Sequence, residues 1–306
     1  MQAADEAMSK KKVLFYNHWH NGDVHMSRSY VRDLMSLLGD CDYYYHHKND
    51  KKLLADIDHL QTVSEMIDAD IAIDTWIGQY HYKGMDTKER VKNRSSFLGC
   101  NFPHYYAVMS QAYDDLGLRR AIKSIDYYIP DIAYEKFYIN NIKEFFCVHA
   151  GLSVLISNNP AMSFQAPDVD FDSIVSSLAG EFPLVCFIMT NPGTVKIEKN
   201  NVFYCSDIVN SPVQTNDLNE ISYISTHCKV IVGRSSGPYS FSITRKNVQD
   251  KKFVCICNVQ KDAWMLGGQI DVRWTNNSSA EYLLSMLSSV ISEETGTGPF
   301  SFKGGV

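Results

Sequence analysis

One short segment near the start of the sequence concentrates reactive side chains. Residues 17–25, with the sequence NHWHNGDVH, hold three histidines, one aspartate and one glycine. A carboxylate or imidazole at the rim of a binding cleft can take a proton from an attacking hydroxyl, so Asp23 and His25 are candidate general bases. A plain turn would use Gly22 and a capping Asp or Ser but would not need three histidines, and we therefore favour a functional loop.

The same segment supports a second interpretation, a metal site. Imidazoles and carboxylates bind transition metals, so His18, His20, Asp23 and His25 could together serve a metal-dependent phosphoesterase. Gly-Asp-Val-His at residues 22–25 is similar to the Gly-Asp-x-His element of metallophosphoesterases. That family also needs a Gly-Asn-His element, which this sequence lacks. We therefore expect no bound metal.

A second candidate site lies in residues 230–239, VIVGRSSGPY, where an apolar strand runs into small residues and a helix. Backbone N–H groups at such a helix start, together with the helix dipole, can hold a phosphate oxygen. Ser235, Ser236 and Gly237 would supply these contacts, and Arg234 would add a charge-assisted one. An ordinary strand-to-helix turn with serine caps is the alternative explanation.

Asn158 and Asn159 form a third candidate, directly after the predicted strand at residues 152–157. Their amides can donate to phosphate or sugar oxygens, although Asn-Pro is also a common turn sequence. Neither GxxxxGK[ST] nor a strand followed by GxGxxG occurs, so the familiar nucleotide-binding loops are absent.

The elements that position these loops are predicted from apolar runs alternating with amphipathic stretches. Strands are expected at residues 13–16, 41–46, 71–76, 152–157, 184–189, 202–205, 229–233 and, as the last one, 253–257. Helices are expected at residues 30–38, 57–67, 171–178, 218–224 and 280–291, near Tyr239, and through most of residues 105–146. This alternation predicts an α/β protein with two Rossmann-like domains, residues 1–150 and 151–306, whose parallel sheets face a central cleft.

Composition excludes several classes of protein. The 306 residues are 45% hydrophobic and carry a net charge of −6, which argues against a general nucleic-acid binder. No run approaches the roughly 20 apolar residues of a membrane span. Residues 1–12 are polar and lack the apolar core of a signal peptide, so we expect a cytoplasmic protein whose eight cysteines are free thiols.

The two principal loops together resemble GT-B glycosyltransferases of the heptosyltransferase type. Gly22-Asp23-Val24 matches that family's Gly-Asp-apolar loop after the first strand. Residues 233–238, GRSSGP, match the spacing of its Gly-x-Asp-Ser/Thr-Gly-Pro turn near the end of the second domain. Two positions depart from the pattern, since Ser235 replaces the family's aspartate and Ser240 its histidine. These differences imply either a donor other than heptose or a divergent branch of the family.

The resemblance implies a transferase that moves a sugar from a nucleotide sugar to a hydroxyl of a glycan or similar acceptor. Asp23 would be the base, Ser236 and Gly237 would hold the donor phosphates in the second domain, and the acceptor would bind the first. The nucleotide sugar would be a co-substrate, with no further cofactor. A module that binds nucleotides or glycans without catalysis is a third hypothesis, beside the phosphoesterase.

Overall fold

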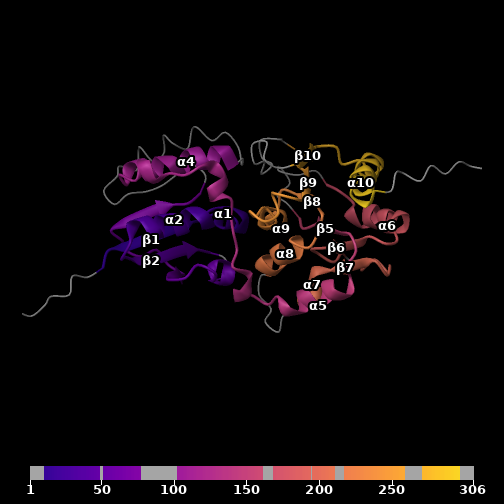
Figure 1. The fold of residues 1–306 in the computed structure, drawn as a ribbon, viewed down its shortest axis with the longest axis horizontal. Coiled ribbons are helices and arrows are strands. Elements are labelled where there is room, and N and C mark those ends of the chain that lie inside the picture. The colour runs from indigo at the N-terminus through magenta and orange to yellow at the C-terminus, as the bar shows by residue number, and fades with distance from the viewer. Residues whose placement is uncertain are drawn as a thin grey trace, which may run out of the picture. The chain divides into compact units, whose positions relative to one another are not determined.

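The structure, a computed structural model, describes residues 10–48, 51–76, 102–160, 168–193, 195–210, 217–258 and 271–296. The chain forms two compact units, and the main division between them lies between Pro130 and Asp131. Each unit has its own sheet, and every strand pair in both sheets is parallel (Figure 1). The prediction of an α/β protein built on two parallel sheets is confirmed.

Unit 1 contains a four-stranded sheet in the order β3-β2-β1-β4. Its strands are β1 (Lys12–Asn17), β2 (Asp42–His47), β3 (Leu60–Val63) and β4 (Ile71–Asp74). Its helices are α1 (Asn21–Met26), α2 (Arg28–Leu38) and α4 (Phe102–Asp115), with short 3-10 segments at Lys51–Leu54, Arg119–Ala121 and Ile125–Tyr128. After its first residue β1 is completely buried, as expected for a central strand covered on both faces.

Unit 2 contains a six-stranded sheet in the order β10-β9-β8-β5-β6-β7. Its strands are β5 (Ser153–Ser157), β6 (Cys186–Met189), β7 (Val202–Tyr204), β8 (Val230–Arg234), β9 (Lys252–Ile256) and β10 (Asp271–Thr275). Its helices are α5 (Asn140–Val148), α6 (Phe171–Glu181), α7 (Cys205–Val209), α8 (Leu218–Ser225), α9 (Gly237–Phe241) and α10 (Ala280–Thr295), and a 3-10 segment lies at Tyr134–Lys136.

The core of unit 2 follows the two-residue period of its strands. Val154 and Ile156 of β5, with Val230 and Val232 of β8, point into one cluster together with the apolar faces of α6 and α10. Figure 1 shows these two helices together at one side of the sheet, away from α8 and α9. In the described parts of the chain, no helix combines the length and apolar composition needed to cross a bilayer.

The helix predicted over residues 57–67 is wrong, because Leu60–Val63 is the edge strand β3. The apolar residues of this segment lie at helical spacing, but the backbone pairs in parallel with β2, Leu60 opposite Tyr43. His59 adopts a left-handed conformation, φ 63°, immediately before the strand, which a continuous helix does not allow. Strand pairing therefore outweighs local spacing here.

Two further predictions are corrected. Residues 253–257 do not form the last strand, because β10 pairs with β9 at the edge of the sheet. Only two of its five residues, Val272 and Trp274, are large and apolar, so it gives a weak signal in sequence. Residues 105–146 are helical only at their ends, in α4 and α5, with three 3-10 turns between them.

The boundary between the units lies about twenty residues before the expected position near residue 150. Residues 131–150 pack on unit 2, because α5 lies against α7 and α8. The side chain of Asn141 donates to the carbonyl of Val209 at 3.0 Å, and the ring of Phe145 meets that of Phe203 at 5.0 Å. The apolar face of α5 therefore assigns it to the second unit.

Candidate active site

Asp23 lies on α1, which follows the carboxyl end of β1. Its carboxylate accepts a hydrogen bond from the backbone N–H of His20, the residue that caps the helix, at 3.2 Å. The first N–H groups of a helix have no partner inside it, so an acidic residue at the third helical position is stabilised there. The hydrogen bond to His20 therefore holds the carboxylate of Asp23 beside the loop that joins β1 to α1.

The environment of Asp23 changes its acidity. Burial of its carboxyl removes water from the charged form and raises its pKa from 3.8 to about 6. The hydrogen bond from the His20 backbone and the positive charge available on the His20 ring oppose the shift but do not cancel it. Such a group is still ionised at neutral pH and accepts a proton more readily than an ordinary carboxylate.

His25, the second predicted base, lies in the interior with no exposed surface. Its Nδ1 accepts a hydrogen bond from Nε of Arg28 at 3.1 Å. Arg28 is equally buried, forms an ion pair with Asp56 and donates to the carbonyl of Leu53. The structure therefore places His25 in a network that anchors α1 to the segment before β3.

The other histidines of the loop pack with aromatic rings. The ring of His18 contacts those of Tyr16 and His46 edge-on, each at 5.4 Å, and His20 lies beside Trp19. Among the residues that the structure describes, no three His, Cys, Asp or Glu side chains are grouped so that they could hold a metal ion. The phosphoesterase hypothesis thus has no ligand set in this part of the chain.

The predicted phosphate loop connects β8 to α9 in unit 2. The hydroxyl of Ser236 does not cap the helix but lies 3.0 Å from the hydroxyl of Ser157, at the end of β5. The N–H groups of the first turn of α9, that of Gly237 among them, have no partner within the helix. Ser236 and Gly237 therefore lie where the loop meets the first turn of α9, and Ser235 lies at the bend before them.

Gly233 makes this arrangement possible. It pairs with Ser157 across β8 and β5, and a Cβ at position 233 would lie 2.5 Å from the Cβ of Ser157. Only glycine allows this approach, which brings the two serine hydroxyls together. At Gly237, in contrast, the nearest atom to an added Cβ is 3.8 Å away on Leu218, an ordinary contact.

Arg234 and the two asparagines have partners within the protein. The guanidinium of Arg234 donates to Asp168 at 3.3 Å and to the carbonyl of Val169 at 3.1 Å. The amide of Asn158 bonds to the backbone of residue 191 in both directions, at 2.6 and 2.8 Å. The side-chain oxygen of Asn159 accepts from the hydroxyl of Thr190. These asparagines join the loops after β5 and β6, which is a sufficient structural role.

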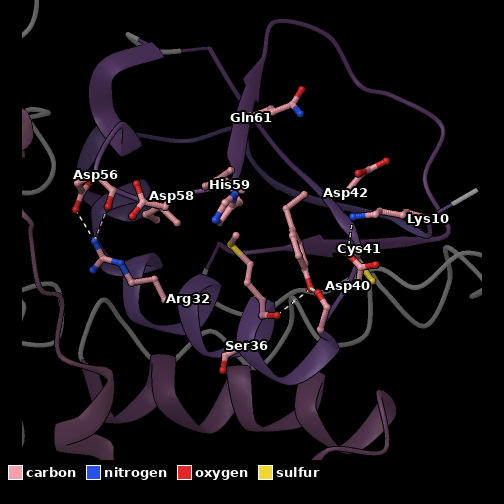
Figure 2. Close-up of a pocket in the computed structure, with 15 residues that line it drawn as sticks. Lys10, Arg32, Ser36, Asp40, Cys41, Asp42, Asp56, Asp58, His59 and Gln61 are labelled. Atoms are coloured by element: carbon pink, nitrogen blue, oxygen red, sulfur yellow. Dashed lines mark hydrogen bonds and ion pairs between the residues drawn. The ribbon is translucent and has the colours of Figure 1, made fainter.

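A cavity of about 780 Å³ lies elsewhere in unit 1 and contains none of the predicted site residues (Figure 2). It borders the starts of β2 and β3, the edge of the sheet opposite to the carboxyl end of β1. Figure 2 shows its two ion pairs, Lys10 with Asp40 and Arg32 with Asp56. The lining also contains Asp42 and Asp58, so its carboxylates outnumber its lysine and arginine side chains.

Comparison with known proteins identifies the fold. No family model matches the sequence, and no curated protein sequence does. Among solved structures, heptosyltransferase WaaC of Escherichia coli with ADP-2-deoxy-2-fluoro heptose aligns at a TM-score of 0.59 and 10% identity, over 93% of this chain and 99% of that one. The same enzyme with ADP aligns at a TM-score of 0.55 and 10% identity, over 93% of this chain and 98% of that one. A glycosyl transferase family 9 protein from Veillonella parvula aligns at a TM-score of 0.50 and 12% identity, over 94% of this chain and 90% of that one.

The chain has the GT-B fold. The resemblance inferred from two loops is thus confirmed at the level of the fold, over almost the whole chain. At 10–12% identity, the roles of individual residues in this GT-B protein rest on its own geometry.

Sequence analysis missed two tryptophans beside the candidate base. Trp19 and Trp76 lie just after β1 and β4, and their rings stack. The sequence does contain a signal for them. Trp19 stands two positions after Asn17, and Trp76 two positions after Asp74, and each of these polar residues ends an apolar strand. Such a residue can turn the chain by accepting the N–H two residues on.

Proposed function

We propose that this protein is a glycosyltransferase that moves a sugar from a nucleotide sugar to a hydroxyl of a glycan or similar acceptor. Unit 2 binds the donor, with its phosphates at Ser236 and Gly237. Unit 1 binds the acceptor next to Asp23. The phosphate loop and the WaaC structures that contain ADP and an ADP-heptose analogue support a nucleotide sugar as donor.

In the proposed reaction the carboxylate of Asp23 takes the proton of the acceptor hydroxyl as its oxygen attacks the anomeric carbon of the donor. The new glycosidic bond forms while the bond from that carbon to the diphosphate oxygen breaks. The departing diphosphate carries the developing negative charge, which the N–H groups at the start of α9 and the hydroxyl of Ser236 stabilise. The hydroxyls of Ser157 and Ser236 lie 3.0 Å apart, so the hydroxyl of Ser236 is held in place before the donor binds.

The observation that carries the proposal is the state of Asp23. Its pKa of about 6, raised by burial, suits a group that must be ionised at neutral pH and then accept a proton. His25 is not assigned this step, because Arg28 occupies one ring nitrogen and the side chain is buried. We assign it the positioning of α1.

A panel of UDP-, GDP-, ADP- and CMP-sugars tests the donor site by thermal shift. We expect one nucleotide class to raise the melting temperature, since a ligand at 100 times its Kd stabilises a protein by about 2.7 kcal/mol. Gly237→Ala is expected to fold normally, because the added methyl has room, but to weaken donor binding by about tenfold where phosphate meets the backbone.

Gly180→Ala is the matched control for that variant. It makes the same change in α6, where the only close atom is the end of the flexible Lys199 side chain. The control should bind the donor as the wild type does. If none of the four nucleotide classes shifts the melting temperature of the wild type, the proposal is contradicted.

The pH dependence of transfer tests the base. Asp23 must be deprotonated to act, so transfer should be complete above its pKa of about 6 and fall about tenfold per pH unit below it. Initial rates from pH 4.5 to 8 at low acceptor concentration report this ionisation in the free enzyme. A rate that stays flat from pH 7 to pH 5, with the protein still folded, would exclude Asp23 as the base.

A further inference from the structure

Two stacked tryptophans stand at the carboxyl edge of the sheet in unit 1. The ring centres of Trp19 and Trp76 are 4.6 Å apart, with 19° between their planes. Trp19 is 46% exposed, although a large aromatic side chain is normally mostly buried. This pair, which we call the tryptophan platform, follows the ends of the neighbouring strands β1 and β4.

Both tryptophans are held by the same local device. The side-chain oxygen of Asn17 accepts the backbone N–H of Trp19 at 2.9 Å, and that of Asp74 accepts the N–H of Trp76 at 3.0 Å. Asn17 and Asp74 are themselves buried, and the amide of Asn17 also donates to the hydroxyl of Thr75 at 3.3 Å. Two buried turns on adjacent strands therefore hold one rigid aromatic surface.

The platform adjoins the candidate base. Trp19 precedes His20, whose backbone N–H holds the carboxylate of Asp23, and the rings of Trp19 and His20 meet edge to face at 6.4 Å. Residues 17–27 and 71–76 contain neither lysine nor arginine. An uncharged ligand fits these segments better than an anion does. Imidazole groups beside an aromatic face suit a molecule with one apolar side and several hydroxyls.

We propose that the tryptophan platform binds an uncharged pyranose ring of the acceptor. The C–H bonds on one face of such a ring are apolar and weakly positive, so they pack on the negative face of an indole. The hydroxyls at the ring's edge remain free for polar partners, and one of them would be presented to Asp23. This assignment rests on the proposed function, which places the acceptor in unit 1.

A nucleobase also stacks on aromatic rings. We favour the sugar because the donor nucleotide is assigned to unit 2 and the platform belongs to unit 1. The turns that hold it follow β1, which leads into the helix of Asp23, and the neighbouring strand β4.

Titration of the 306-residue protein with methyl β-D-glucopyranoside, methyl β-D-galactopyranoside and their N-acetylamino analogues tests the proposal. Binding is followed by tryptophan fluorescence and by saturation-transfer NMR. We expect at least one glycoside to bind saturably, Trp19→Ala to weaken it by about tenfold or more, and Trp19→Phe to keep most of the binding. In transfer assays Trp19→Ala should raise the acceptor KM and leave the donor KM unchanged.

Trp274→Phe is the control, because the indole of Trp274 donates to the carbonyl of Cys257 in unit 2 and should not affect glycoside binding. The proposal is overturned if no glycoside binds, or if Trp19→Ala binds glycosides as well as the wild type does. It is also overturned if adenosine or uridine quenches the tryptophan fluorescence while the glycosides do not. These results are independent of the donor panel. Glycoside binding without any nucleotide shift would reject the transferase function but not the platform.

Discussion

Replacing Asp23 by asparagine is expected to lower sugar transfer by about 10²–10⁴-fold, the usual contribution of a general base, while donor binding is retained. Asparagine keeps the side-chain oxygen that accepts the N–H of His20, so α1 should still begin at Asn21. The variant loses only the ability to take a proton. Initial rates and donor thermal shifts measured on the same preparation separate the two effects.

The same variant has a second expected signature, in stability. Burial raises the pKa of Asp23 from 3.8 to about 6, so its charged form opposes folding. This penalty is fully present above pH 6, shrinks as the pH falls through 6, and vanishes below the ordinary value. Asp23→Asn should therefore stabilise the protein at pH 7–8 by on the order of 1 kcal/mol, after allowance for solvent screening, and not at pH 3.5. Near-normal transfer in this variant would remove Asp23 from the mechanism.

Replacing Arg28 by methionine is expected to destabilise unit 1 by about 3–5 kcal/mol, as found when one member of a buried ion pair is removed. Arg28 and Asp56 have no exposed side-chain surface, and the carboxylate of Asp56 would keep its ion pair with the partly exposed Arg32, at 2.5 Å. The hydrogen bond to His25 would also be lost. Urea unfolding at pH 7 measures the change.

Lys10→Met provides the matched control for Arg28→Met. Lys10 forms an ion pair with Asp40 in the same unit, but both side chains are more than half exposed. Such surface pairs contribute about 0–1 kcal/mol, so this variant should unfold almost as the wild type does. Adding Asp56→Leu to Arg28→Met should recover part of the lost stability, because the buried carboxylate that has lost its buried cation is then removed. Equal effects of Arg28→Met and Lys10→Met would show that the buried pair is not a structural anchor.

The architecture was largely predictable because central parallel strands are apolar on both faces. Val13–Tyr16 and Val230–Gly233 are nearly continuous apolar runs, which few other structures explain. Edge strands lack this signal. Leu60–Val63 is half-exposed and has helical spacing, and β10 alternates polar with apolar residues, so one was mistaken for a helix and the other missed.

The candidate site was predictable only in part. Two patterns are local: Asp23 stands at the third position of α1, and a serine-glycine turn precedes α9. Both predicted loops form. The partners of His25, Asn158 and Arg234 come from distant segments, and spacing along the chain carries no information about them. For the same reason sequence analysis could not see that Trp19 and Trp76, 57 positions apart, would stack.

By itself the sequence determined two parallel α/β units and the loops in which the reactive groups lie, because strand burial and helix starts depend on neighbouring residues. Tertiary structure alone decided which of those groups is available for chemistry. Burial raises the pKa of Asp23 to about 6, Arg28 engages His25 in the interior, and β-sheet pairing brings the two tryptophans together. Desolvation, ion pairing and stacking depend on distances in space, and these exist only once the chain has folded.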